Sequence, residues 1–204
     1  MSGVAGPERA EAVLIGIGSE FRRDDGVAMA VLAAITDDGE PGDPAFDRVV
    51  LCDGEPTRVI EAWQDAGLAV VVDAVHAHPG EPGRIHQLAF TPQPGAENGW
   101  APEQEGAAST GAASTGAAST GAAATGGANA AGTHGLGLGD AAALGAALGL
   151  MPERLVVIGV EGQDFDLGPG LSPPVAAAVP AAAGRIRRLL LDHHRAGRAG
   201  GSAS

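Results

Sequence analysis

Two adjacent carboxylates behind a glycine turn are the first residues whose types and spacing suggest chemistry. In the stretch AVLIGIGSEFRRDDGVAMAVLAAI (residues 12–35), an apolar run ends in Gly-Ile-Gly, and Asp24 and Asp25 precede a second apolar run. Such glycines are typical of a dinucleotide site, but the third glycine of that motif would fall on Phe21. Two carboxylates at a helix start repel a phosphate and suit a cation. Capping of the helix is the simpler alternative, and it explains one carboxylate well and the second only in part.

An aspartate and a histidine farther along the chain are candidates for the same kind of site. Asp73 ends the apolar run LAVVV, where a strand-end residue bonded to loop amides is an equally good interpretation. His134 lies in GTHGLGLGD, where the glycines let its ring reach across the loop. His76 and His78 belong to a loop rich in Pro and Gly, and they rank below His134. Two carboxylates and one imidazole from separate loops, here one of the pair Asp24 and Asp25 with Asp73 and His134, would suit a divalent metal with open coordination positions.

Alternating strand and helix patterns are expected to position these residues. Continuous β-rich apolar runs predict strands buried on both faces, and apolar residues at helical spacing predict helices between them. An α/β fold follows, with a mostly parallel sheet, helices on both faces, and ligands at the carboxyl ends of the strands. The expected strands are 12–18, 49–53, 68–75 and 154–160, and a strand at 83–90 is expected to be antiparallel or at an edge. The first expected helix starts at Asp24 or Asp25, and three more helices are expected at 56–66, 139–150 and 175–194.

The glycines of the first turn and a serine near the end of the chain have structural interpretations. Gly16 and Gly18 are expected to allow the tight turn that brings the acidic loop over the edge of the sheet. Ser172, in GLSPPV, is followed by proline, which favours a residue at a helix start over a nucleophile. The chain has no G-x-S-x-G and no H-E-x-x-H motif, so the common hydrolase and zinc-protease sites are excluded.

A low-complexity segment interrupts the alternating pattern. Residues 106–125 read GAAST three times and then GAAAT, a repeat of small residues that has no face to bury. We therefore expect one domain at 12–195, interrupted by a disordered insertion at about 97–131, with loose termini at 1–11 and 196–204. An alanine-rich helix is the alternative for the repeat, and a glycine at every fifth residue weakens it.

Composition sets the broad class of the protein. The chain has 204 residues, 45% of them hydrophobic, and a net charge of −13. This charge argues against nucleic-acid and anionic-membrane partners, which need clustered Lys and Arg. The single cysteine, Cys52, excludes an internal disulfide and fits a reducing compartment. Because the N-terminus has no apolar signal core and no segment reaches transmembrane length, a cytoplasmic protein is expected.

Four motifs in order then point to a family. They are VLIGIGSEFRRDDGVA, VVVDAV, GTHGLGLGDAAAL and VVIGVEGQDFDLGPGLSPPV, and together they span about residues 12–190. The chain resembles the hydrogenase maturation proteases, endopeptidases that finish the large subunit of nickel-iron hydrogenases. The resemblance implies a three-layer α/β/α fold around a twisted sheet. It also implies an activity, the removal of a C-terminal extension from the large-subunit precursor once nickel has been inserted. The precursor is then the expected partner of this protein, which is expected to be a monomer.

The resemblance also implies which residues form the site. Asp25, Asp73 and His134 match the three family positions that bind a divalent metal. The family logic favours recognition of the nickel already bound in the substrate, and a resident metal that activates water is the second possibility. Asp25 or Asp73 would be the catalytic carboxylate if the aspartic-type grouping of such enzymes applies. Ser19 stands where the family usually has Asn, which places any specific role of that amide in question.

Two alternatives from other classes stay open at this point. One is a nucleotide-binding or redox-sensing α/β module, with Asp53 at the ribose position. The other is an inactive chaperone that binds the hydrogenase precursor without cutting it. Binding of NAD or ATP would favour the first alternative, and a processing assay separates the second from a protease.

Overall fold

The chain folds around one six-stranded sheet, shown by a computed structural model that describes residues 11–37, 44–93, 100–102 and 135–200. The strand order is β2-β1-β3-β6-β4-β5. The strands are β1 (Ala12–Ile17), β2 (Arg48–Cys52), β3 (Leu68–Val75), β4 (Ile85–Pro92), β5 (Trp100–Pro102) and β6 (Leu155–Glu161), and the helices are η1 (Arg23–Gly26), α1 (Val27–Asp37), α2 (Pro56–Trp63), α3 (Gly135–Leu148) and α4 (Pro173–Gly200).

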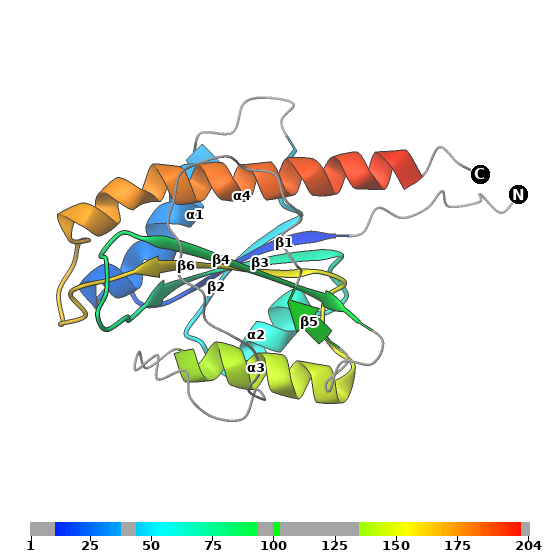
Figure 1. Cartoon of the computed structure of the whole chain (residues 1–204), viewed down its shortest axis with the longest axis horizontal. Coiled ribbons are helices and arrows are strands. Elements are labelled where there is room, and N and C mark those ends of the chain that lie inside the picture. Colours follow the sequence, from blue (N-terminus) through cyan, green and yellow to red (C-terminus); the bar gives the residue numbers. More distant parts are fainter. Residues whose placement is uncertain (1–10, 38–43, 94–99, 103–134, 201–204) are drawn as a thin grey trace, which may run out of the picture.

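Helices cover both faces of the sheet, which makes a three-layer α/β/α architecture (Figure 1). One apolar cluster packs α1 and α4 against one face, and a second packs α2 and α3 against the other. All six residues of β1 and the first six of β3 are buried, as continuous apolar runs predict. The expected fold class is therefore confirmed. None of the described helices is both long and apolar enough to cross a membrane.

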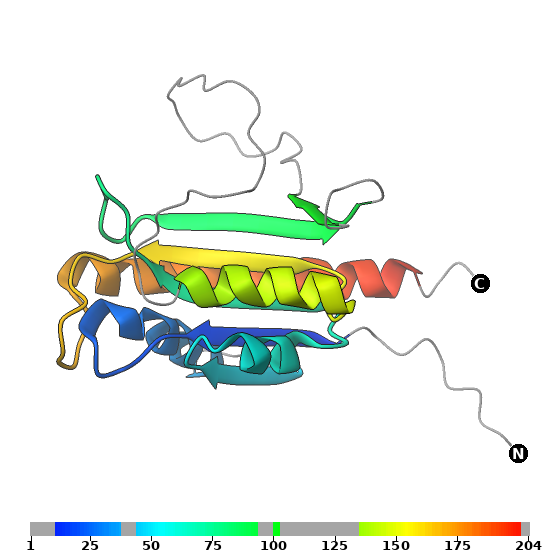
Figure 2. The same cartoon turned by 90° about the horizontal axis from the view of Figure 1, so that it is seen from below.

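The central strands are parallel, so their carboxyl ends lie at the same edge. β1 pairs with β2 and β3, and β3 pairs with β6, all in parallel register. β4 runs antiparallel to β6, as expected for 83–90. Figure 2 shows this edge at the left, where η1, the first turn of α3 and the segment between β6 and α4 also lie. We call it the carboxyl edge.

Three expectations about element boundaries need correction. Residues 100–102, inside the expected insertion, form β5 against the end of β4, because a three-residue antiparallel strand leaves no pattern in the sequence. The helix α4 continues to Gly200 instead of ending at 194, since its Ala and Arg residues are good helix formers. Neither Asp24 nor Asp25 caps a helix, because both lie inside the short helix η1. The GAAST repeats and His134 lie outside the described residues.

Candidate functional site

The turn after β1 depends on Gly18, as predicted, whereas Gly16 lies within β1 without a positive φ and faces the side chains of Leu51 and Leu32. Gly18 has φ +138°, and a Cβ atom on it would lie 2.0 Å from the backbone oxygen of Asp25. Only glycine allows this approach without a shift of the backbone. The amide of Ser19 then donates to Oδ2 of Asp25 at 2.9 Å. Gly18 thus brings the turn close enough for a backbone amide to hold a buried carboxylate.

Asp24 is a structural carboxylate. It is fully buried, and it accepts hydrogen bonds from the amides of Gln163, Asp164 and Ser172 and from the Ser172 hydroxyl. Burial by itself raises the pKa of Asp24, but these hydrogen bonds, led by the Ser172 amide, together bring it below its ordinary value. Ser172 lies directly before α4, and its carbonyl accepts from the amide of Ala176, so the expectation of a helix-start residue is confirmed.

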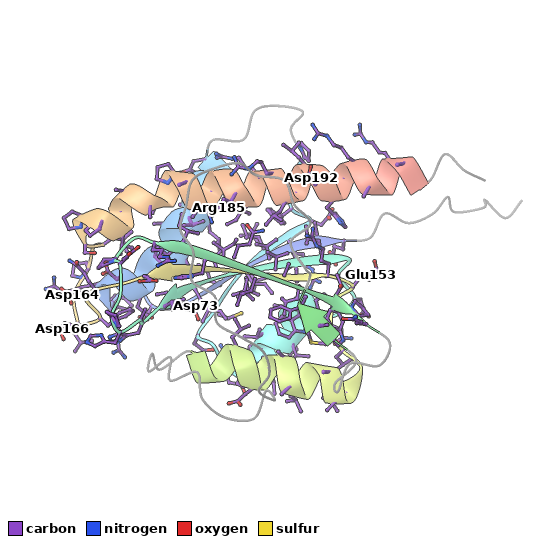
Figure 3. The ribbon with its side chains drawn as sticks, viewed as in Figure 1. Asp73, Glu153, Asp164, Asp166, Arg185 and Asp192 are labelled. Atoms are coloured by element: carbon purple, nitrogen blue, oxygen red, sulfur yellow. The ribbon has the colours of Figure 1, made fainter. Side chains whose placement is uncertain are left out.

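The loop 19–25 and the loop 162–172 form one unit through further contacts. The amide of Arg23 donates to the carbonyl of Gly168, and the amide of Gly168 donates to the carbonyl of Phe21. The side chain of Arg23 also pairs with Asp164 at 3.2 Å. Figure 3 places Asp164 and Asp166 at the extreme end of the molecule, beyond the strands. Asp25 is therefore carried on a loop that a distant segment holds in place.

Asp73 is a buried carboxylate of a different kind. It is 5% exposed, and its Oδ1 atom has no hydrogen-bond partner among the described residues. Burial raises its pKa to about 7, and the nearby charge of Asp25 adds to the shift, while the amide of Ala74 acts against it. The two carboxylates are thus close enough to interact, as the positions at the carboxyl edge predict.

Asp25 and Asp73 together favour a cation. A buried carboxylate with an unpartnered oxygen, next to a second carboxylate, lowers its free energy by binding positive charge. Within the part of the chain that the structure describes, no group of three His, Cys, Asp or Glu side chains is placed to hold a metal ion. The expected third ligand, His134, is outside that part, one position before Gly135, where α3 begins at the carboxyl edge (Figure 2). The structure therefore brings together two of the three expected ligands.

Other candidates from the sequence lie apart from this carboxylate pair. Asp53 is exposed, and its carboxylate is 3.7 Å from the guanidinium of Arg58. His76 is exposed and stacks on Phe165 with ring centroids 5.1 Å apart, and His78 lies edge-on to His76. Their ranking below His134 stays a prediction, because His134 lies outside the described residues.

A second polar pair at the carboxyl edge escaped the sequence analysis. Glu161, the last residue of β6, is 3% exposed and accepts hydrogen bonds from the Glu81 amide and from Nε2 of His86. Burial alone raises the pKa of Glu161, but these bonds and the nearby Arg84 bring it below its ordinary value. The available signal was the charged residue that ends the run VVIGV, just as Asp73 ends LAVVV.

No family model matches this chain, and no curated protein matches it in sequence. Solved structures do match. The hydrogenase maturating endopeptidase HybD from E. coli superposes with a TM-score of 0.61 at 18% identity, over 89% of this chain and 93% of that chain. The [NiFe] hydrogenase maturation protease HybD from Thermococcus kodakarensis gives 0.54 at 18% identity, over 88% and 99%.

A third structure, described as a solution structure of an endopeptidase from Escherichia coli, has a TM-score of 0.59 at 18% identity. It covers 86% of this chain and 89% of its own. The class that fold and site define is thus a three-layer α/β/α protein with an acidic site at the carboxyl edge. Within that class, the chain has the fold of the hydrogenase maturation proteases.

Proposed function

We propose that this protein is an endopeptidase that removes the C-terminal extension of a nickel-iron hydrogenase large-subunit precursor after nickel insertion. The observation that carries the proposal is the carboxylate pair Asp25 and Asp73, with the buried, unpartnered Oδ1 of Asp73, at the edge where α/β sheets build their sites. The same fold in maturation endopeptidases supports it. The large-subunit precursor is the proposed partner.

In this proposal the nickel is part of the substrate. Asp25, Asp73 and His134 would contact the nickel that the precursor already holds, and its presence would report that the precursor is ready for cutting. Because the pKa of Asp73 is about 7, a cation at this place would displace a proton from its carboxyl group at neutral pH. Carboxylates and a neutral imidazole suit such a metal while other positions stay with the substrate.

The decisive experiment is incubation of the nickel-loaded precursor with the protein, followed by mass measurement of the precursor's C-terminus. We expect a shortened large subunit, and no shortening of the nickel-free precursor. Asp73→Asn should abolish the cut. Asp192→Asn is a matched control, because Asp192 is an exposed carboxylate on α4, far from Asp73 in Figure 3. An intact precursor after incubation with the wild-type protein would contradict the proposal, and would favour a chaperone if a complex forms.

The nucleotide-binding alternative has less support. The Ser19 amide, which a phosphate would need, donates to Asp25, and the turn presents two buried carboxylates. A thermal-shift series decides between the two. We expect stabilisation by nickel or cadmium and none by NAD or ATP, whereas the reverse result would favour the nucleotide module.

A further inference from the structure

The structure contains a second polar pair that the metal site does not use, and the geometry points to His86 as the proton-transfer residue of the cleavage step, with Glu161 as its positioning partner. This inference rests on the proposed function. It deepens that function by naming the group that activates water, which neither Asp25 nor Asp73 is free to do while both contact the metal.

His86 and Asp73 lie on the same face of the sheet and in the same row. Gly159 on β6 is in register with Asp73 on β3 and with His86 on β4. Since registered residues project to the same face, both side chains lie on the face covered by α2 and α3. Neighbouring strands are about 4.8 Å apart, so the backbones at Asp73 and His86 are separated by roughly 10 Å.

The space between them is apolar. A Cβ atom at Gly159 would lie 2.5 Å from Cγ2 of Val75, so this methyl group lies where a side chain of residue 159 would be. The imidazole therefore does not compete with Asp73 for the metal. An extended chain covers about 10 Å in three residues, so a substrate held at Asp73 by its nickel brings a peptide bond a few residues away to His86.

Glu161 fixes the imidazole. Its carboxylate is 4% exposed and lies 2.5 Å from Nε2 of His86, and the Glu81 amide bonds its other oxygen. A carboxylate that accepts from Nε2 keeps the proton of the neutral ring there, which leaves Nδ1 as the basic nitrogen. The described residues give Nδ1 no hydrogen-bond partner, and the side chain is 41% exposed, so water and substrate can reach it.

The charged groups around His86 come from three elements. Glu161 faces it from β6, Asp73 lies along the row on β3, and Glu81 and Arg84 lie on the chain that leads into β4, where they pair at 3.5 Å. Glu161 is the only one of these that bonds to the ring among the described residues. In the described part of the chain, no carboxylate bonds to His76 or His78 on the neighbouring loop, where His76 stacks on Phe165 and His78 bonds the Ala77 carbonyl.

The proposed step is hydrolysis of the peptide bond, and water is its only co-reactant. The water oxygen bonds to the carbonyl carbon of the scissile peptide while Nδ1 of His86 takes a water proton. When the tetrahedral intermediate collapses, the C–N bond breaks and the imidazolium returns that proton to the leaving nitrogen. The products are a new carboxylate on the large subunit and the amine of the released extension.

The test compares His86→Gln with the wild type in processing of the nickel-loaded precursor across pH 5 to 8, the range in which an imidazole changes charge. Glutamine can still donate from Nε2 to Glu161, so the contact is kept while the base is lost. We expect a fall in kcat of roughly 10²-fold, with KM within about threefold and a flatter pH–rate profile. Glu161→Gln should lower kcat less, and His76→Gln, the exposed matched control, should behave as wild type.

The outcomes separate the two proposals. If the wild type cuts the precursor and His86→Gln cuts it within about threefold of that rate with an unchanged pH profile, the assignment of His86 is wrong and the proposed function stands. If the wild type leaves the precursor intact, the proposed function fails and this assignment fails with it. Should His86→Gln not fold, His86→Ala with added imidazole decides, because recovery of the rate supports proton transfer and absence of recovery overturns it.

Discussion

Asp24 and Asp73 are both buried carboxylates at the carboxyl edge, yet their surroundings differ. Asp24 accepts four hydrogen bonds from the loop 162–172, two of them from Ser172, and its pKa is lowered. Asp73 keeps an unpartnered oxygen, and its pKa is raised to about 7. The first stabilises the fold as an anion, whereas the second is an unfavourable anion until a cation arrives.

This difference in hydrogen bonding distinguishes a carboxylate that stabilises the fold, Asp24, from one that belongs to the candidate site, Asp73. Asp25, next to Asp24 in sequence, is close enough to Asp73 for its charge to add to the pKa shift of Asp73, so two neighbouring aspartates serve two purposes. Function in this fold is expected where hydrogen bonding is incomplete, because the folded chain holds the unfavourable charge ready for a ligand. Substitutions at the two carboxylates should therefore have opposite effects on stability and on processing.

The largest effect is expected for Asp73→Asn. Loss of a metal-contacting carboxylate should lower processing of the nickel-loaded precursor by roughly 10³-fold. Stability at neutral pH should be kept or raised, because the amide has no charge to desolvate. Processing assays and urea unfolding of the same preparation measure both. Full processing activity in Asp73→Asn would remove Asp73 from the site.

Asp24→Ala should have the reverse profile. The change removes the buried acceptor of three partly buried amides and of the Ser172 hydroxyl, and we expect the free energy of unfolding to fall by about 3 kcal/mol, measured by urea unfolding. Asp166→Ala is the matched control, since Asp166 is exposed in the same loop, and it should change stability by less than about 0.5 kcal/mol. Equal stability of the two variants would contradict a structural role for Asp24.

The two carboxylates should also be distinguished by pH. Because the folded pKa of Asp73 is about 7 and the unfolded value about 4, folded protein binds the proton more tightly between these values. Its contribution to stability therefore decreases as pH rises from 4 to 7, by about 3 kcal/mol relative to Asp73→Asn. The lowered pKa of Asp24 has the opposite sign, and its contribution is lost on acidification below its unfolded value. Parallel curves for wild type and Asp73→Asn would contradict the shift.

The smallest effect is expected at Ser19, where this chain departs from the usual Asn. The contact to Asp25 comes from the backbone amide of Ser19, so the side chain contributes little to it. Ser19→Ala and Ser19→Asn should each change stability by less than about 1 kcal/mol and processing by less than about threefold. A large loss of processing in Ser19→Ala would assign the hydroxyl to substrate binding.

Much of the fold was predictable from the pattern of apolar residues. The runs at 12–18, 68–75 and 154–160 form buried parallel strands because a strand covered on both faces needs continuous apolar residues. The strand β5 and the last turns of α4 were not predictable, since three residues carry no period and helix ends depend on tertiary contacts. Processing activity, the metal ligands and the role of His134 stay predictions.

By itself the sequence determined that Asp25 and Asp73 follow parallel strands and so meet at one edge, because residue order sets strand direction and strand direction sets the edge. Only the tertiary structure decided which of the acidic side chains have hydrogen-bond partners for their carboxylate oxygens. The partners of Asp24 come from positions about 140 residues away, and the partner of Glu161 comes from 75 residues away. Burial and hydrogen bonding set the charge of a carboxylate, and both depend on segments that are distant in the chain and adjacent only after folding.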